Sequence, residues 1–364
     1  MKKLFIRSPY FIVINETAQI GSKLELYLWN KGTTEPTTPT YTLSKRNASA
    51  TQTQNIYNVS NYAKDFIKPI ASQVFFTGIT EEDNDNWCYL KAKQYKETAP
   101  NSYSLISTET YVCLNGYTTY EQGSNVSNSA NQILLHALEK GVAKFYYNRE
   151  IASTYPFVNL FVGADITPQT VTILYKDFLG NTISTTNITT DANDYVYRIP
   201  ITTNAVAFDD GGTMTINSTD LGVLGKLKSY PICEHKYDTA IVTYMNRYGG
   251  WRHITFFKAN TQSIEVTSTD YSLLPSSVFY NTSKGQKQTY NNNGKHSIKY
   301  NTGWVDEVYF NYIQDMLLSE VVMLNSRPVL LKTKSLQKKT HLIDRMINYE
   351  LEFEYANSIL NNVI

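Results

Sequence analysis

The order of apolar and polar residues in the last third of the chain constrains the fold more than any other feature. The segment 237–257 indicates a β-hairpin, because two strand-like runs flank the glycines of Arg247–Gly250 and glycine permits the positive φ of a tight turn. We expect an amphipathic helix from Thr302 or Gly303, followed by a second hairpin at 320–332. The apolar face of that helix is formed by Val308, Tyr312, Ile313, Met316 and Leu317.

The final strand, 347–357, alternates strictly between apolar and acidic residues. Because successive side chains of a strand point to opposite faces, one face is expected to be buried and the other to meet water or a basic partner. The apolar set is Tyr349, Leu351, Phe353 and Tyr355, and the acidic set is Glu350, Glu352 and Glu354.

A basic segment, 332–345, lies just before this strand, and its lysines are Lys332, Lys334, Lys338 and Lys339. One interpretation is a solvated loop. The functional alternative is contact with an acidic surface on an adjacent subunit, such as the glutamate face of the final strand in another copy.

Composition favours a β-rich protein with neutral polar surfaces. Lys and Arg number 33 against 32 Asp and Glu, and charged residues are 18% of the chain, below the roughly 25% of ordinary domains. Tyrosine, with 29 residues, suits both strands and broad protein contacts, because it buries a ring and still satisfies its hydroxyl. The charge balance argues against a dedicated nucleic-acid binder, which normally carries a basic excess on one face.

We expect a mainly β fold, with two immunoglobulin- or fibronectin-like β-sandwich domains and a C-terminal β-rich α+β domain that holds the one amphipathic helix. The 364 residues allow two or three domains. The predicted parts are an N-terminal sandwich at 1–125, a helix or linker at 126–144, a small sandwich at 145–230 and the C-terminal domain at 231–364. In the linker, Ser129 is placed to cap a helix that ends at Gly141. The polar segments 31–55 and 281–296 are predicted as long loops, the first of them alternatively as an exposed edge.

No residues gather into a pattern that indicates catalysis, a cofactor or a metal. The five histidines have no partner at helical spacing, and the three cysteines are too few and scattered for a zinc site. Cys88 and Cys113 are expected to be reduced, buried thiols on neighbouring strands. Neither a nucleophile elbow nor a phosphate-binding loop occurs, although glycosidase carboxylates, which are not local in sequence, stay open.

No membrane span is expected, since no stretch approaches ~18 apolar residues. Pro9 interrupts the first apolar run, so we expect no signal peptide.

Several segments resemble virion structural proteins of tailed phages that infect Bacteroidetes, including the crAss-like group. The resemblance is carried by "PICEHKYDTAIVTYMNRYGGWRHITFF" (231–257), "NTGWVDEVYFNYIQDMLLSE" (301–320), "PVLLKTKS" (328–335), "INYELEFEYAN" (347–357) and the opening pattern of 7–45. It touches both ends of the chain, whereas the middle sandwich is less distinctive.

The resemblance implies a non-enzymatic component of the phage tail or neck, made in the host cytoplasm and carried in the virion. Such proteins stack as closed rings, here expected to be six- or twelve-fold, between the portal and the distal tail. The implied partners are further copies of the chain and neighbouring portal or tail proteins, with DNA only as passing cargo. The family offers no catalytic residues to carry over, and a neutral chain suits a conduit that does not grip DNA.

Two other classes of function stay open from the residues alone. One is a receptor- or glycan-binding tail module, although no loop concentrates Trp, Asp and Asn. The other is a glycan-cleaving enzyme, for which no carboxylate pair is evident. The first hairpin has two interpretations as well: a structural turn with Trp251 in the core, or a tip whose Arg247 and Tyr248 protrude into a neighbouring subunit.

Overall fold

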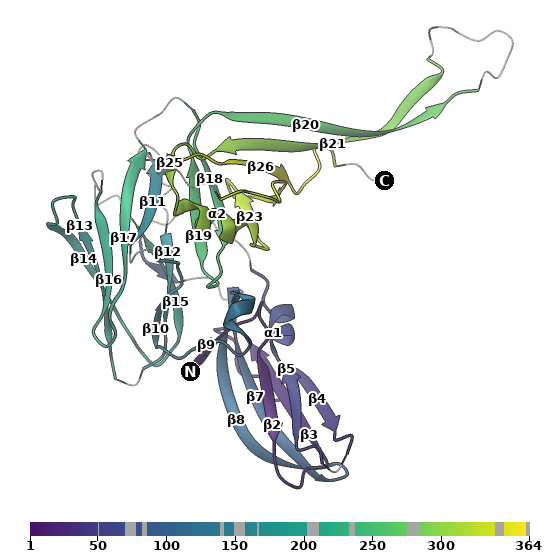
Figure 1. The fold of residues 1–364 in the computed structure, drawn as a ribbon, viewed down its shortest axis with the longest axis vertical. Coiled ribbons are helices and arrows are strands. Elements are labelled where there is room, and N and C mark those ends of the chain that lie inside the picture. Colours follow the sequence, from purple (N-terminus) through teal and green to yellow (C-terminus); the bar gives the residue numbers. More distant parts are fainter. Residues whose placement is uncertain are drawn as a thin grey trace. The chain divides into compact units, whose positions relative to one another are not determined.

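The computed structural model describes residues 1–49, 51–69, 78–81, 86–138, 142–148, 157–165, 167–201, 211–232, 237–274, 283, 285–338 and 346–361. Over these residues the chain is mainly β, as predicted, with α-helices α1 (Ser60–Phe66) and α2 (Tyr309–Leu317) and a short 3-10 helix, Tyr120–Gln122 (Figure 1). It divides into two compact units. The first comprises Met1–Cys233, Thr243–Ile254 and Ser319–Val321, and the second comprises Glu234–Val242, Thr255–Leu318 and Val322–Ile364.

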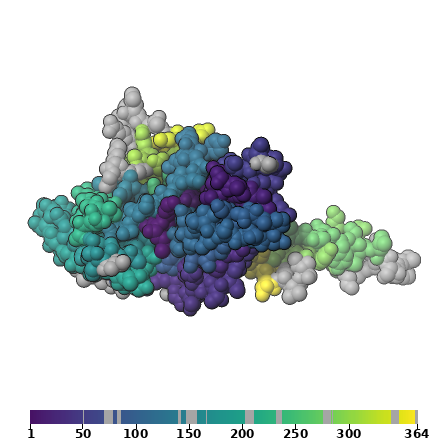
Figure 2. All heavy atoms as spheres, turned by 90° about the horizontal axis from the view of Figure 1, so that it is seen from below, coloured from purple at the N-terminus to yellow at the C-terminus, as the bar shows by residue number. Residues whose placement is uncertain are grey.

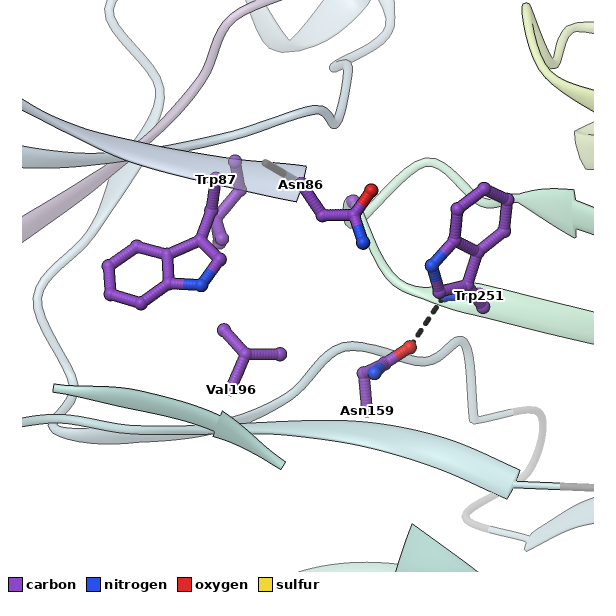
Figure 3. A pocket seen from close by; sticks show the side chains of 7 residues that line it. Asn86, Trp87, Asn159, Val196 and Trp251 are labelled. Atoms are coloured by element: carbon purple, nitrogen blue, oxygen red, sulfur yellow. Dashed lines mark hydrogen bonds between the residues drawn. The ribbon is translucent and has the colours of Figure 1, made fainter. Parts of the chain in front are cut away.

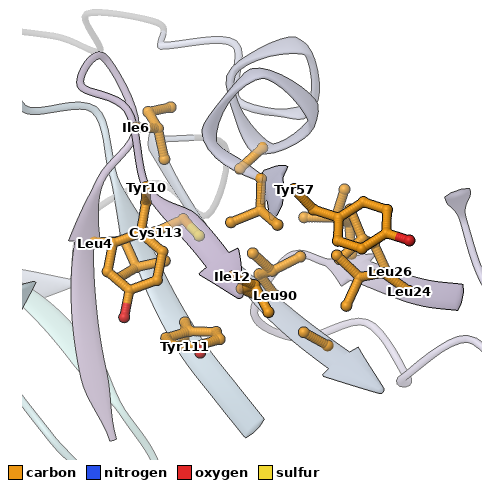
Figure 4. Close-up of a cluster of buried hydrophobic side chains, with 14 of the residues drawn as sticks. Leu4, Ile6, Tyr10, Ile12, Leu24, Leu26, Tyr57, Leu90, Tyr111 and Cys113 are labelled. Atoms are coloured by element: carbon orange, nitrogen blue, oxygen red, sulfur yellow. The ribbon is translucent and has the colours of Figure 1, made fainter. Parts of the chain in front are cut away.

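The first unit begins with a six-stranded sheet in the order β4-β3-β7-β8-β1-β9. Its strands are β1 (Lys2–Phe5), β3 (Gly21–Trp29), β4 (Tyr41–Arg46), β7 (Trp87–Ala99), β8 (Ser102–Leu114) and β9 (Ser127–Asn128). A ribbon of β2 (Phe11–Asn15) and β5 (Gln54–Asn58) packs with α1 on one face of this sheet. Figure 4 shows the shared core, in which Ile12 and Tyr57 of the ribbon meet Leu24 and Leu26 of β3. Alternate residues of β3 are apolar, so one face of the strand is buried there.

The same unit contains a second pair of sheets that share one apolar core. One sheet has the order β10-β12-β15-β6, with strands Gln132–Leu134, Phe157–Val162, Tyr195–Pro200 and Thr80–Glu81. The other has the order β11-β17-β16-β13-β14, with strands Val142–Asn148, Gly222–Ile232, Thr213–Ser218, Thr170–Lys176 and Thr182–Thr189. Strand β13 buries every second residue, Val171, Ile173 and Tyr175, which is the pattern of a sandwich strand.

A seven-stranded sheet has the order β19-β18-β23-β24-β26-β21-β20. Its strands are β18 (Ala240–Met245), β19 (Trp251–Phe256), β20 (Asn260–Ser272), β21 (Lys287–Asn301), β23 (Val322–Leu324), β24 (Arg327–Leu331) and β26 (Glu350–Tyr355), and β22 (Val305–Asp306) pairs separately with β25 (Met346–Ile347). The hairpin predicted at 320–332 is confirmed by β23 and β24, whose turn places Asn325 and Ser326 at positive φ. The alternation predicted for the final strand is confirmed at Leu351 and Phe353, which are buried, but it is not kept at the end of the strand, where Glu354 is buried and Tyr355 only partly so.

The helix predicted from Ser129 to Gly141 is wrong over its described residues. Gln132–Leu134 is instead strand β10, antiparallel to β12. Leu134 and Leu135 are both buried but join different apolar clusters, as adjacent residues of an extended chain do. The apolar run is too short for its periodicity to separate helix from strand. Residues 139–141 lie outside the described part of the chain.

Two further expectations need correction. Most of the loop predicted at 281–296 is the first part of β21, and the loop predicted at 31–55 contains β4, which is an exposed edge strand as the alternative had it. Helix α2 starts at Tyr309, not at Thr302 or Gly303, because Gly303 has a positive φ and β22 comes between them. The predicted apolar face is buried at Tyr312, Ile313 and Met316. Cys88 and Cys113 are free, buried and directly opposite each other on β7 and β8, as expected for reduced thiols.

Candidate assembly surface

The acidic face of the final strand finds its basic partners within the same chain. Lys332 Nζ lies 3.2 Å from a Glu354 oxygen and 3.8 Å from Glu352, while Lys295 Nζ lies 2.9 Å from the other Glu354 oxygen. Lys299 pairs with Glu350. The hydrogen bond from Lys295 is the main cause that holds the pKa of Glu354 below its usual value. The contact predicted between Lys332 and the glutamates therefore forms within one copy.

Two further lysines of the basic segment are described, and neither joins this group of ion pairs. Lys334 and Lys338 are exposed, and Lys338 Nζ lies 6.0 Å from the centre of the Phe310 ring. Lys339 lies outside the described residues.

The tip of the β18–β19 hairpin packs on the first unit to which it belongs. Tyr248 joins the cluster around Trp87 and Leu114 and makes an edge contact with Phe5, with ring centroids 6.4 Å apart. The carbonyl of Arg247 accepts a 2.7 Å hydrogen bond from the Tyr117 amide, and its guanidinium donates to Gln122 Oε1 at 3.3 Å. A Cβ at Gly116 would stand 2.5 Å from that same carbonyl, so the tip and the 116–117 backbone are in close contact. The structure favours the structural interpretation of this hairpin.

Tyr248→Ala is expected to lower the free energy of unfolding by about 2 kcal/mol, because a half-buried aromatic ring is removed from an apolar cluster. Arg247→Ala is expected to cost less than about 1 kcal/mol, since its side-chain partner is exposed. Urea denaturation of the monomer measures both values, with the exposed Tyr120→Ala as the control. Unchanged stability of Tyr248→Ala together with weaker self-association would restore the tip as an interface.

Strands β20 and β21 form a long hairpin that the sequence did not predict. Only Ser297–Asn301 of β21 pair with β26, so the stretch from Lys287 to His296 is paired with β20 alone. All of β20 after Asn260 is exposed. Figure 1 labels both strands of the hairpin, and in Figure 2 its outer part appears as green spheres. We call this outer part, Ile264–Ser272 with Lys287–His296, the arm.

The arm carries uncovered apolar side chains on one face. Ile264 and Val266 are 62% and 65% exposed, and they lie opposite His296 and Gly294. Two residues further along β21, Ile298 is buried beside Phe353, so these positions continue the core face of the sheet into solvent. The signal available in the sequence was the alternation Ile264-Glu265-Val266, which is short and lies among Ser, Thr and Gln residues.

The C-terminal segment runs along the arm. The Ile359 amide donates to the Gly294 carbonyl at 2.8 Å, and Asn293 Nδ2 donates to the Leu360 carbonyl at 3.0 Å. Ile359 Cδ1 would lie 3.0 Å from a Cβ built at Gly294, and the side chain is half exposed. Ile264, Val266 and Ile359 together form what we call the apolar strip.

The first unit buries a group of basic side chains. His136 and His253 are both buried, near the guanidinium of Arg252, and Arg198 lies near His253. Burial lowers the pKa of His253 to about 3, with the Arg252 and Arg198 charges as further causes. Burial also lowers the pKa of His136, again helped by Arg252. Thr243 Oγ1 lies 3.0 Å from His253 Nδ1 and fixes that ring. Both histidines are therefore neutral at pH 7.

A cavity in the first unit is too small to be an active site. Its volume is about 10 Å³, which suits a single water molecule. Trp87, Asn159 and Trp251 line it, and the Trp251 amide donates to Asn159 Oδ1 at 2.7 Å (Figure 3). This hydrogen bond links strand β19 to strand β12. The cavity is therefore a small void between packed strands of the first unit.

Among the residues that the structure describes, no group of three or more His, Cys, Asp or Glu side chains is placed to hold a metal ion. Over the same residues, none of the helices has the length and apolar composition that crossing a bilayer requires. No family model matches the chain, and a search of curated proteins found no relative.

Proposed function

We propose that this chain is a non-enzymatic structural component of a phage tail or neck. Copies of it assemble as a closed ring between the portal and the distal tail and form part of the DNA conduit. The arm is the observation that carries the proposal, because over the described residues its two strands pair with no further strand of the sheet, and Ile264 and Val266 on it are exposed. The resemblance of the segments at 7–45 and 231–357 to phage virion proteins supplies the biological setting.

The arm favours assembly on physical grounds. An isolated two-stranded hairpin is at best marginally stable in water, and its stability normally comes from packing a face on something else. The exposed Ile264 and Val266 have no such cover within their sheet. Apolar side chains gathered on an exposed surface typically mark a protein contact. A projecting arm that enters the next subunit makes a head-to-tail contact, and rotation closes such contacts into rings.

The electrostatics of the chain support the conduit part of the proposal. Its formal net charge is +1, and the acidic side chains of β26 are paired with Lys295, Lys299 and Lys332 of the same chain. A ring of such subunits presents little net charge to passing DNA and so exerts little electrostatic hold on its phosphates.

Native mass spectrometry across a protein concentration series tests the proposal. A closed ring, six- or twelve-fold, is the expected result. A strict trimer contradicts it and favours the fibre or receptor-binding class of tail protein. A chain that stays monomeric throughout the series also contradicts it, and binding to a glycan array then tests the adhesin alternative.

A further inference from the structure

In the part of the chain that the structure describes, two strands end their sheets with a long edge that no further strand pairs with. β20 is the last strand of the seven-stranded sheet, and β14 is the last strand of the five-stranded sheet in the first unit. Apart from Asn260, Ser184 and the buried Ile188, every residue of the two strands is exposed. Each edge presents backbone amide and carbonyl groups that a further strand can pair with.

Edge strands are commonly protected from such pairing by lysine, proline, other charged side chains, β-bulges or very short length. Neither of these two strands contains lysine or proline and neither is short, but each has a register irregularity, between Thr267 and Thr269 in β20 and at Ile183 in β14. β14 has eight residues, Thr182–Thr189, with no charged residue and no proline. β20 has thirteen residues, among which only Glu265 and Asp270 are charged. By contrast, the edge strand β4 carries Lys45 and Arg46, and the Lys45 ammonium donates a hydrogen bond to the Ile56 carbonyl of β5.

The β14 edge also presents apolar side chains of its own. The turn between β13 and β14 is ordered, because the Asn181 amide donates to Asp177 Oδ1 at 2.7 Å and the Asp177 amide donates to the Asn181 carbonyl at 2.9 Å. This ordered turn holds Phe178 and Leu179 in solvent, with exposed fractions of 59% and 72%, and Ile183 follows on the strand. These residues are exposed and apolar, as are the residues of the apolar strip.

We propose that the β20 edge of one copy pairs with the β14 edge of the next copy, so that the arm continues the five-stranded sheet of its neighbour. The inference deepens the proposed assembly and rests on it. Strand addition supplies main-chain hydrogen bonds, while the apolar strip packs near Phe178, Leu179 and Ile183 of the neighbour. All eight residues of β14 fit within the thirteen of β20.

A second copy of the chain is the occupant that accounts for both edges at once. Each copy offers one donor edge and one acceptor edge, and they differ in sequence and in sheet. Such a contact is heterologous, because it joins different surfaces of the two copies. In a closed ring, both edges of every copy are paired. A partner of another kind that covered only the arm would leave the β14 edge and its exposed turn unexplained.

Two full-length variants separate the two edges. The arm variant carries Ile264→Lys with Val266→Lys, and the edge variant carries Ile183→Lys with Thr185→Lys. All four side chains are exposed, so both variants are expected to unfold at the temperature of the wild-type monomer. Each variant alone is expected to raise the dissociation constant of self-association about 30-fold or more. The control adds the same charges to another edge, with Thr42→Lys and Ser44→Lys on β4, and is expected to assemble normally.

Mixing the two variants gives the decisive result. The arm variant retains a sound β14 edge and the edge variant retains a sound arm, so an equimolar mixture is expected to form one-to-one heterodimers in native mass spectrometry and nothing larger. An edge variant that assembles like wild type, or a mixture that stays monomeric, overturns this pairing and leaves the proposed ring standing. Wild-type protein that stays monomeric overturns both.

Discussion

Trp251→Ala is expected to lower the free energy of unfolding of the first unit by about 3–5 kcal/mol. The indole is only 2% exposed and forms an apolar cluster with Phe157 and Met245. The residue also borders the small cavity, so truncation would enlarge an existing void, and the cost of a large-to-small substitution rises with the volume left empty. The hydrogen bond from its backbone amide to Asn159 survives the substitution, so the loss reports the side chain of Trp251 and not its backbone.

Trp304→Ala is the matched control, because the same side chain there is 65% exposed. It is expected to change stability by less than about 0.5 kcal/mol, as most exposed substitutions do. Urea denaturation followed by far-UV circular dichroism measures both variants without relying on tryptophan emission. Equal losses for the two variants would show that Trp251 is not part of the core that the cluster around Phe157 indicates.

The parts of the fold that sequence reasoning predicted share a strong local signal. The hairpin at 237–257 combines two apolar runs with paired glycines, and Gly249 does adopt a positive φ in the turn. The final strand was predicted from its strict alternation, which is imposed by burial of one face against the sheet. Local pattern sufficed in both cases because the turn chemistry and the apolar period point to the same structure.

The failures arose where tertiary contacts decide the structure. Gln132 is buried and accepts a hydrogen bond from Ser218 Oγ at 2.6 Å, a contact 86 residues away that no helical pattern reveals. The arm was not predicted because its composition resembles that of a loop. Its strand β21 is rich in Asn, Lys and Tyr, a composition typical of a loop, and it stays extended through pairing with β20. Propensity is a weak guide to a strand whose stability comes from its partner.

For the candidate assembly surface too, local features could be predicted from the sequence and contacts between strands could not. The sequence identified lysines and glutamates of opposite charge in neighbouring segments, but it did not say that β24 and β26 are adjacent strands, which places Lys332 beside Glu354 in one copy. Register is a property of the assembled sheet, so an intrachain pair and an intersubunit pair have the same appearance in the sequence. The uncovered faces of β20 and β14 become evident only when the strand order is known.

Mild acid is expected to destabilise the first unit between pH 6.5 and pH 5. His253 has a pKa of about 3 in the folded chain, against 6.5 for an ordinary histidine, and the pKa of His136 is lowered as well. Above pH 7 both rings are neutral in the folded and the unfolded chain, so they add no pH dependence. Below 6.5 the unfolded chain takes up protons that the folded chain does not, and stability falls by about 1.4 kcal/mol per pH unit for His253, with His136 adding to the loss in the same direction.

His253 alone is expected to cost about 2 kcal/mol of stability at pH 5 relative to pH 7.5, over 1.5 pH units, and the lowered pKa of His136 adds to this loss in the same direction. Urea denaturation at a series of pH values measures this slope. The interval stays above the range in which Glu and Asp of an unfolded chain titrate, near pH 4, so the carboxylates contribute little there. A flat profile down to pH 5 would show that the rings are protonated in the folded protein or are reached by water.

The variant His136→Leu tests how much of the loss of stability in acid comes from His136. Neither ring nitrogen of His136 has a hydrogen-bond partner in the described structure, and the ring packs on Phe145 with centroids 5.1 Å apart. An apolar side chain of similar volume therefore removes two buried polar atoms without leaving a partner behind, and it is expected to keep or raise stability at pH 7.5. It is also expected to reduce the loss of stability between pH 6.5 and pH 5, because one of the two rings with a lowered pKa is then absent. Loss of stability at pH 7.5 in His136→Leu would show that the imidazole has a polar partner, and the burial argument for its lowered pKa would then fail.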